Sequence, residues 1–137
     1  MIQQVVSDAS ASHVLDASAL LAWLHGEPGA EIVEAALSRS VISSVNWAEV
    51  LQKIIARGMR EPEDVGEDLQ YLGLDVMPFT VDDAERAARL WSMSRQAGLS
   101  LGDRACLSLA QRLDLIALTA DRRWATLDMG VEVRLIR

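Results

Sequence analysis

The sequence contains a single cysteine, Cys106, among 137 residues. No internal disulfide can form, and a zinc site built from several thiolates is excluded. No apolar run reaches the roughly 18 residues that a membrane-spanning helix needs. The first thirteen residues have neither the basic start nor the apolar stretch of a signal peptide. We therefore expect a protein of the reducing cytoplasm that has no membrane partner.

Basic residues are also scarce, since 13 Lys and Arg stand against 20 Asp and Glu and the formal net charge is −7. A general nucleic-acid binder usually carries a basic face, so the charge argues against that class. It does not exclude an enzyme that acts on nucleic acid, provided that some of the acids hold cations. A basic partner protein would relieve the same acidity.

Short apolar runs alternate with stretches whose apolar residues recur at helical spacing. This pattern predicts strands at 13–16, 41–43, 74–79, 115–119 and 131–136, and helices at 17–25, 30–37, 46–57, 62–72, 81–96 and 100–113. Strands separated by helices imply a parallel sheet that is covered on both faces. We expect a loose lead-in over residues 1–11 and one α/β domain over 12–137, a three-layer sandwich with a five-stranded parallel sheet.

Four acids stand at the ends of apolar runs: Asp16 in VLDASALLAWL, Glu49 in NWAEVLQK, Asp103 in LSLGDRACLSLA and Asp121 in ALTADRRWA. Functional residues of parallel sheets collect where strands end, so we expect these acids to share a small volume. Carboxylates that lie close together raise each other's pKa unless a cation compensates. Mg²⁺ and Mn²⁺ prefer carboxylate oxygen, and such a site suits phosphodiester hydrolysis.

Each acid also has a purely structural explanation. Asp103 follows Ser100 by three residues, which is the spacing of a helix capping box. Glu49 follows Asn46 by the same spacing, so Asn46 is either a cap or a hydrogen-bond donor that orients the acid. The other two acids could cap the turns that follow their strands. Any single acid is explained as well by a cap as by a ligand, but four acids at one edge favour a site.

The four segments, in this order and spacing, resemble the PIN-domain family and most closely the VapC-type toxins of bacterial toxin–antitoxin pairs. The resemblance covers the chain from His13 to Arg137. It implies a five-stranded parallel sheet and an endoribonuclease that binds Mg²⁺ or Mn²⁺. The implied ligands are Asp16, Asp103, Asp121 and, directly or through water, Glu49. The implied supporting polar groups are Ser18, Asn46 and Thr119.

The resemblance also implies partners, namely a cognate antitoxin that inserts a segment into the acidic site and a second copy of the chain in a homodimer. The RNA substrate would meet Arg104 or Arg122, which neighbour two of the acids. Hydrolysis would leave 5′-phosphate and 3′-hydroxyl ends.

Two other classes are weaker alternatives. An interaction module could keep the fold without catalysis, but the presence of all four acids argues against it. A receiver-type signalling domain also gathers acids at the end of a parallel sheet. Such a domain needs a lysine near the end of its last strand, and Lys53, the only lysine, falls within a predicted helix.

Overall fold

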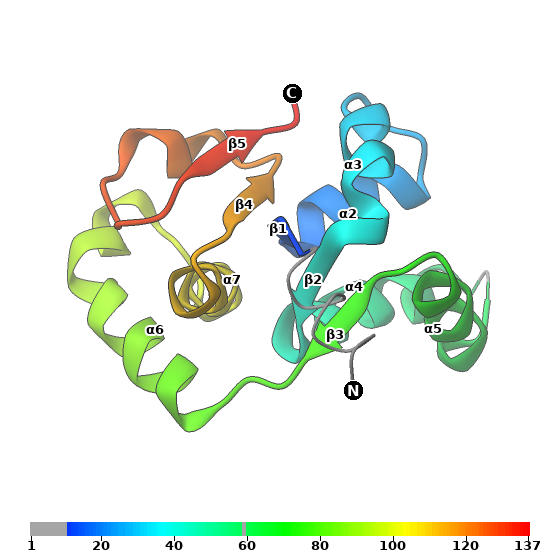
Figure 1. Cartoon of the computed structure of the whole chain (residues 1–137), viewed down its shortest axis with the longest axis horizontal. Coiled ribbons are helices and arrows are strands. Elements are labelled where there is room, and N and C mark those ends of the chain that lie inside the picture. Colours follow the sequence, from blue (N-terminus) through cyan, green and yellow to red (C-terminus); the bar gives the residue numbers. More distant parts are fainter. Residues whose placement is uncertain (1–10, 59) are drawn as a thin grey trace.

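The computed structural model describes residues 11–58 and 60–137, and a parallel sheet lies at its centre between two groups of helices (Figure 1). The strands are β1 (His13–Leu15), β2 (Ser40–Ser43), β3 (Asp75–Met77), β4 (Ile116–Thr119) and β5 (Val133–Leu135). The α-helices are α2 (Ala17–Leu24), α3 (Ala30–Ala36), α4 (Ser44–Arg57), α5 (Pro62–Tyr71), α6 (Val81–Ser94) and α7 (Leu101–Leu113). Short 3-10 helices are η1 (Leu37–Arg39), η2 (Arg95–Ala97) and η3 (Arg122–Thr126).

The strand order is β3-β2-β1-β4-β5, and every neighbouring pair is parallel. The chain therefore builds outward from β1 to β3 and then returns to add β4 and β5 on the other side. The order reverses between β1 and β4, where Leu15 pairs with Leu118. Open α/β sheets bind ligands at such a switch point, outside the carboxyl ends of the strands. The predicted fold class is confirmed.

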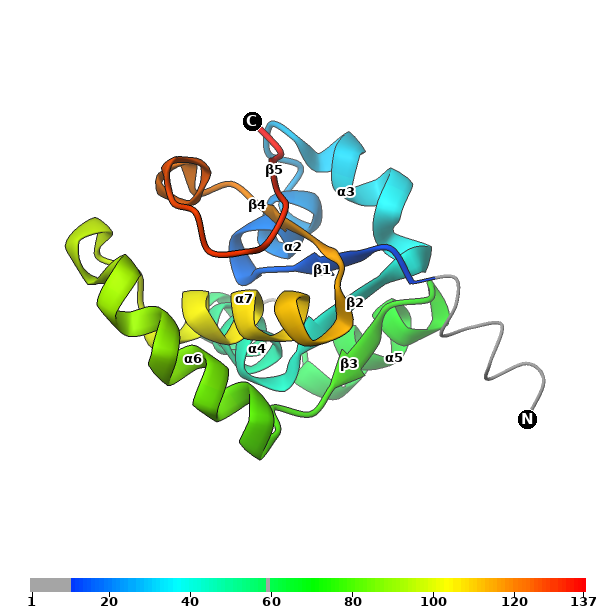
Figure 2. The same cartoon turned by 60° about the vertical axis from the view of Figure 1, so that its left-hand side comes forward.

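Two hydrophobic cores lie on opposite faces of the sheet because successive strand residues point in opposite directions. Leu15, Ile42 and Leu118 pack with helices α2 to α5 in one core. Their neighbours Val14 and Ala117 pack with α6, α7 and η3 in the other. Figure 2 shows α6 and α7 side by side on this second face. The result is the predicted three-layer arrangement.

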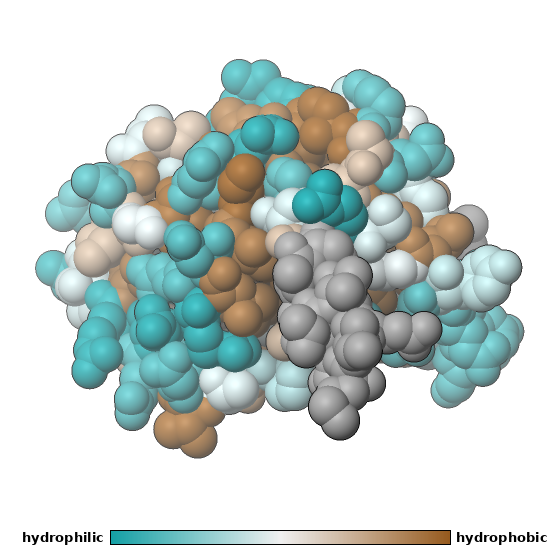
Figure 3. All heavy atoms as spheres, in the orientation of Figure 1, coloured by the Kyte–Doolittle hydropathy of each residue, from teal (hydrophilic) through white to brown (hydrophobic). Residues whose placement is uncertain are grey.

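Hydrophilic side chains gather over α6 and over α5 on the face seen in Figure 3. The acidic run at 61–68, at the start of α5, is largely exposed except for the buried Val65. None of the helices in the described part of the chain combines the length and the apolar character needed to cross a membrane.

Two predicted boundaries are wrong in an informative way. Asp16 is not the last residue of β1 but the N-cap of α2, where its Oδ1 accepts from the Ala19 amide at 2.9 Å. Helix α4 begins at Ser44 because the Ser43 hydroxyl caps it, so Asn46 lies inside the helix and is not a cap. Of the predicted lead-in, only Ala11 belongs to the described residues, and the rest lies outside them.

Candidate active site

Asp16 lies at the switch point between β1 and β4 and is 4% exposed. Its Oδ1 accepts from the Ser18 hydroxyl at 2.7 Å and from the Ala19 amide, and its Oδ2 accepts from the Thr119 hydroxyl at 2.7 Å. All three donors are neutral. Burial raises the pKa of Asp16 to about 6, and the nearby charge of Asp103 adds to the rise, while the three hydrogen bonds only partly oppose it. A buried carboxylate with a raised pKa and neutral donors is a candidate functional group.

The two hydroxyls that contact Asp16 also join α2 to the end of β4. Thr119 Oγ1 accepts from the Asp121 amide at 2.9 Å, and Ser18 Oγ accepts from the Ala120 amide at 3.0 Å. The Thr119 hydroxyl therefore donates to the carboxylate of Asp16 and accepts from the backbone amide of Asp121, so it helps to position both acids. Both residues were predicted as supporting groups, and the structure brings both against Asp16.

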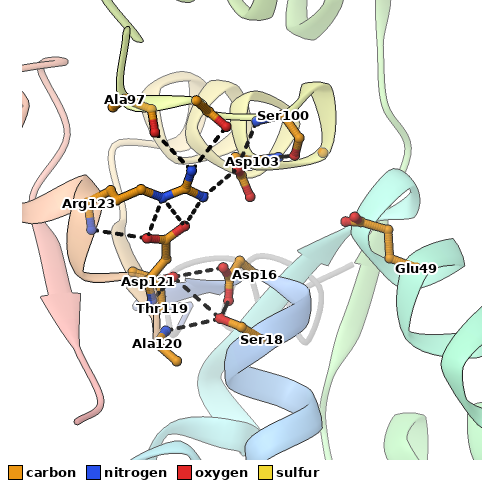
Figure 4. Close-up of polar contacts among 12 residues, drawn as sticks. Asp16, Ser18, Glu49, Ala97, Ser100, Asp103, Thr119, Ala120, Asp121 and Arg123 are labelled. Carbon is orange, nitrogen blue, oxygen red and sulfur yellow. Dashed lines mark hydrogen bonds and ion pairs between the residues drawn. The ribbon is translucent and has the colours of Figure 1, made fainter. Parts of the chain in front are cut away.

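Asp103 and Asp121 face each other across the side chain of Arg123 (Figure 4). Arg123 Nη2 lies 2.5 Å from Asp121 Oδ2 and 3.8 Å from Asp103 Oδ2. The Arg123 guanidinium, through its hydrogen bonds, lowers the pKa of Asp121 from its ordinary value. Arg123 Nη1 also donates to the carbonyls of Ala97 and Gly98. One cation thus holds two of the predicted acids and the segment that precedes α7.

Each of these three aspartates is a cap as well. Asp103 completes a capping box, accepting from the Ser100 amide at 2.8 Å, and Asp121 Oδ1 accepts from the Arg123 amide at 3.0 Å. Asp16 caps α2. The structural explanation and the site are therefore not alternatives, because the caps themselves present their carboxylates to one edge of the sheet.

Glu49 stands apart from the three aspartates, on α4 (Figure 4). Its Oε1 accepts from Asn46 Nδ2 at 2.9 Å, and the same amide group donates to the Gly102 carbonyl at 2.9 Å. Asn46 is buried and acts as the orienting donor that was one of its two predicted roles. Within residues 11–58 and 60–137, no three His, Cys, Asp or Glu side chains are arranged to hold one metal ion.

The donor set nevertheless fits a hard divalent cation in its chemistry. Carboxylate oxygen is the ligand that Mg²⁺ and Mn²⁺ prefer. The Arg123 guanidinium lies against Asp121 and Asp103, so one cation between them is sterically possible. Asp16, Asp103 and Asp121 would supply the carboxylate oxygens, and Arg123 would compete with a metal ion for two of these acids.

The sequence matches the family model of the PIN domain over residues 13–129. The chain belongs to the PIN-domain family. The match leaves the receiver-type alternative without support, and Lys53 lies within α4, as expected. None of the curated protein sequences compared with this PIN domain matches it.

Solved structures with the same fold include a toxin–antitoxin complex from Klebsiella pneumoniae, with a TM-score of 0.73 and 22% identity over 92% of this chain and 98% of that one. DNA-bound VapBC from Salmonella typhimurium gives a TM-score of 0.68 and 16% identity, covering 93% and 99% of the two chains. VapBC-5 from Mycobacterium tuberculosis gives 0.55 and 23%, covering 93% and 98%. At these identities the likeness establishes the fold of this PIN domain.

The phosphate contacts predicted for Arg104 and Arg122 stay a prediction, and a third arginine contacts the acids in the structure. Arg104 Nη1 donates to the Ala87 carbonyl of α6 at 2.8 Å, and Arg122 is exposed at the start of η3. Arg123, which was not selected, is the arginine that contacts the acids. The turn after β4 is the sequence feature that could have indicated Arg123. In such a turn, Asp121 accepts from the backbone amide of Arg123, which places the Arg123 side chain close to the Asp121 carboxylate.

Proposed function

We propose that this PIN domain is a VapC-type toxin, a metal-dependent endoribonuclease that hydrolyses RNA phosphodiester bonds. The observation that carries the proposal is Asp16, a buried carboxylate at the switch point of the sheet with neutral donors and a raised pKa. Asp103 and Asp121 supply two further carboxylates at the same edge. The fold alone supports many functions, so the argument rests on this site.

We assign the cation to Asp16, Asp103 and Asp121, with Glu49 as a direct ligand or a partner through water. These residues would hold Mg²⁺ or Mn²⁺, which would supply charge neutralisation and a water of lowered pKa for phosphodiester hydrolysis. The side chains that bond to these acids hold their carboxylates in place, namely Ser18, Thr119 and Asn46.

The arginines have separate roles in this proposal. Arg123 balances Asp103 and Asp121 in the metal-free protein and would compete with the cation for their carboxylates. Arg122 is exposed beside Asp121, so an RNA phosphate can reach it. Arg104 would first have to leave the Ala87 carbonyl, which makes it the weaker candidate for a phosphate contact.

The proposed partners are a cognate antitoxin and a second copy of the toxin. The structures from Klebsiella pneumoniae and Salmonella typhimurium that share this fold are described as toxin–antitoxin and VapBC complexes. The net charge of −7 suits a basic inhibitory segment. The pairing of Arg123 with Asp121 supports an antitoxin arginine as the inserted group, since a guanidinium binds carboxylates there through more than one nitrogen.

The proposal is tested by cleavage of single-stranded RNA by the purified protein with Mg²⁺, with Mn²⁺ and with a chelator. Asp16→Asn should reduce cleavage by about 100-fold or more, because the site loses a charged ligand. Arg86→Gln is the matched control, since Arg86 is a surface residue that pairs with Asp82 of its own helix. Products should carry 5′-phosphate ends.

Full cleavage by the Asp16→Asn protein, or cleavage that survives the chelator, would refute the assignment. Wild-type protein that binds Mn²⁺ but cleaves no RNA would instead favour the interaction module. Growth arrest on expression, relieved by the product of a short reading frame directly upstream, tests the toxin–antitoxin part separately.

A further inference from the structure

Glu49 and Gly102 meet where α4 packs against the first turn of α7. Gly102 is buried and directly precedes Asp103. A methyl carbon on Gly102 would lie 2.7 Å from both carboxylate oxygens of Glu49 and 2.8 Å from its Cδ. These separations are too short for non-bonded atoms. The Glu49 carboxylate therefore occupies the space that any side chain at position 102 would need.

Asn46 binds both sides of this contact. Its Nδ2 donates to Glu49 Oε1 and to the Gly102 carbonyl, each at 2.9 Å, and the side chain is 1% exposed. The carboxylate of Glu49 points toward the side on which Asp103 lies (Figure 4). Asn46 from α4 and Gly102 from α7 together form a seat for this carboxylate.

The backbone does not explain the glycine. Gly102 lies in the regular helix α7 and has no positive φ, so alanine would fit the backbone and would favour the helix. The remaining explanation is that a side chain at position 102 would collide with the Glu49 carboxylate.

We propose that Gly102 is a positioning residue that leaves room for the Glu49 carboxylate on the side where Asp103 lies and so keeps Glu49 available to the cation. The part that concerns the cation rests on the proposed function, whereas the seat itself does not. Glu49 acts at the site and Gly102 acts only through Glu49.

The test compares Gly102→Ala with Gly66→Ala. Gly66 is also helical, and a methyl carbon there would lie 3.4 Å from Trp47 Cζ2, an ordinary contact. Both variants should melt at or above the wild-type temperature, because alanine favours helices and the end of the Glu49 side chain can move aside. Calorimetric titration with Mn²⁺ should give an affinity lower by about tenfold for Gly102→Ala and unchanged for Gly66→Ala.

A shorter acid at position 49 supplies a rescue that a merely structural role would not produce. Glu49→Asp withdraws the carboxylate by one methylene and should weaken Mn²⁺ binding in the wild-type background. In the Gly102→Ala background the same change removes the collision, so it should cost no further affinity or restore part of it. Strictly additive losses would overturn the inference.

The contact of Asn46 with Glu49 and Gly102 can also be followed in the metal-free protein, by the NMR resonance of the Asn46 side-chain amide. This resonance should shift in Gly102→Ala and not in Gly66→Ala. An unshifted resonance, or wild-type Mn²⁺ affinity in Gly102→Ala, would overturn the inference. Absence of Mn²⁺ binding by the wild-type protein would refute the proposed function, and the Asn46 resonance alone would then decide the role of Gly102.

Discussion

Two capping boxes, at the starts of α6 and α7, use the same local motif in opposite ways. Thr80 with Asp83 opens α6, and Ser100 with Asp103 opens α7, each with both reciprocal hydrogen bonds. Asp83 is fully buried, and Arg112 donates to its two oxygens at 2.6 and 3.2 Å. Asp103 is partly exposed at the edge of the sheet, and the nearest cationic nitrogen is 3.8 Å away.

The difference lies in the partner that the fold supplies. A buried charge is tolerated when it is paired and hydrogen-bonded. The acid of the first box has its own arginine and serves the structure. The acid of the second box shares the exposed cation Arg123 with Asp121 and lies near Asp16, whose donors are neutral. Unmatched negative charge at one edge distinguishes the candidate site from a structural ion pair.

Breaking the first box should have the largest effect on stability. Arg112→Met leaves Asp83 buried without a cation and should lower the free energy of unfolding by about 3 kcal/mol. Urea denaturation at pH 7 measures the loss. Arg86→Met removes an exposed pair within one helix turn and should cost less than about 1 kcal/mol. Equal losses of unfolding free energy for the two variants would show that the pair of buried Asp83 with Arg112 stabilises the fold no more than an exposed surface pair does.

Asp16→Asn should act in the opposite direction and stabilise the metal-free protein by roughly 2 kcal/mol at pH 7.5. The folded pKa of about 6 is above the ordinary 3.8, so the folded state retains a proton that the unfolded state loses between these values. Stability from this group therefore falls as the pH rises from about 4 to about 6. The variant should match the wild type at pH 3.5, which denaturation at both pH values tests. A destabilised variant at pH 7.5 would show that the Asp16 charge is compensated after all.

Removal of the two cap hydroxyls should give equal losses of stability but unequal losses of metal binding. Thr80→Ala and Ser100→Ala should each cost about 1 kcal/mol in unfolding free energy. Only Ser100→Ala loosens an acid of the proposed site, so only that variant should bind Mn²⁺ more weakly in a calorimetric titration. Equal Mn²⁺ affinities would place Asp103 outside the cation site.

Arg123→Met should have the smallest effect on stability, less than about 1 kcal/mol, because the side chain is 49% exposed. The pKa of Asp121 should rise as the guanidinium is lost, which carboxyl NMR titration measures. Mn²⁺ affinity should rise roughly two- to fivefold because a competing cation is gone. Arg122→Met is the neighbouring control and should leave the Asp121 pKa unchanged. A fall in Mn²⁺ affinity in Arg123→Met would show that Arg123 supports the site.

The layers of the fold were predictable because they follow from local patterns. Apolar runs and helical spacing predicted all five strands, and the parallel direction of the strands follows from the helices between them. The edge at which Asp16 and Asp121 meet is a consequence of that order. Helix starts were less accurate, since either Ser43 or Asn46 could cap α4 and only the tertiary structure decides between them.

The electrostatic partners were not predictable from the sequence. Ser100–Asp103 and Thr80–Asp83 have the same spacing. No local pattern indicates that Arg112, 29 residues beyond Asp83, pairs with the acid of the Thr80–Asp83 box. The pairing of Arg123 with Asp121 was not predicted because it depends on the turn at Asp121. The separation of Glu49 from the aspartates depends on how α4 packs against α7, which no local pattern determines.

The central position of β1 has a consequence for the time at which the site forms during synthesis. Asp16 emerges early, but the hydroxyl that binds its Oδ2 belongs to Thr119, 103 residues later. The strand beside it, β4, is synthesised after β1, β2 and β3. The assembled edge therefore cannot form from β1 and α2 alone, and the carboxylates of the candidate site come together only once β4 has joined the sheet.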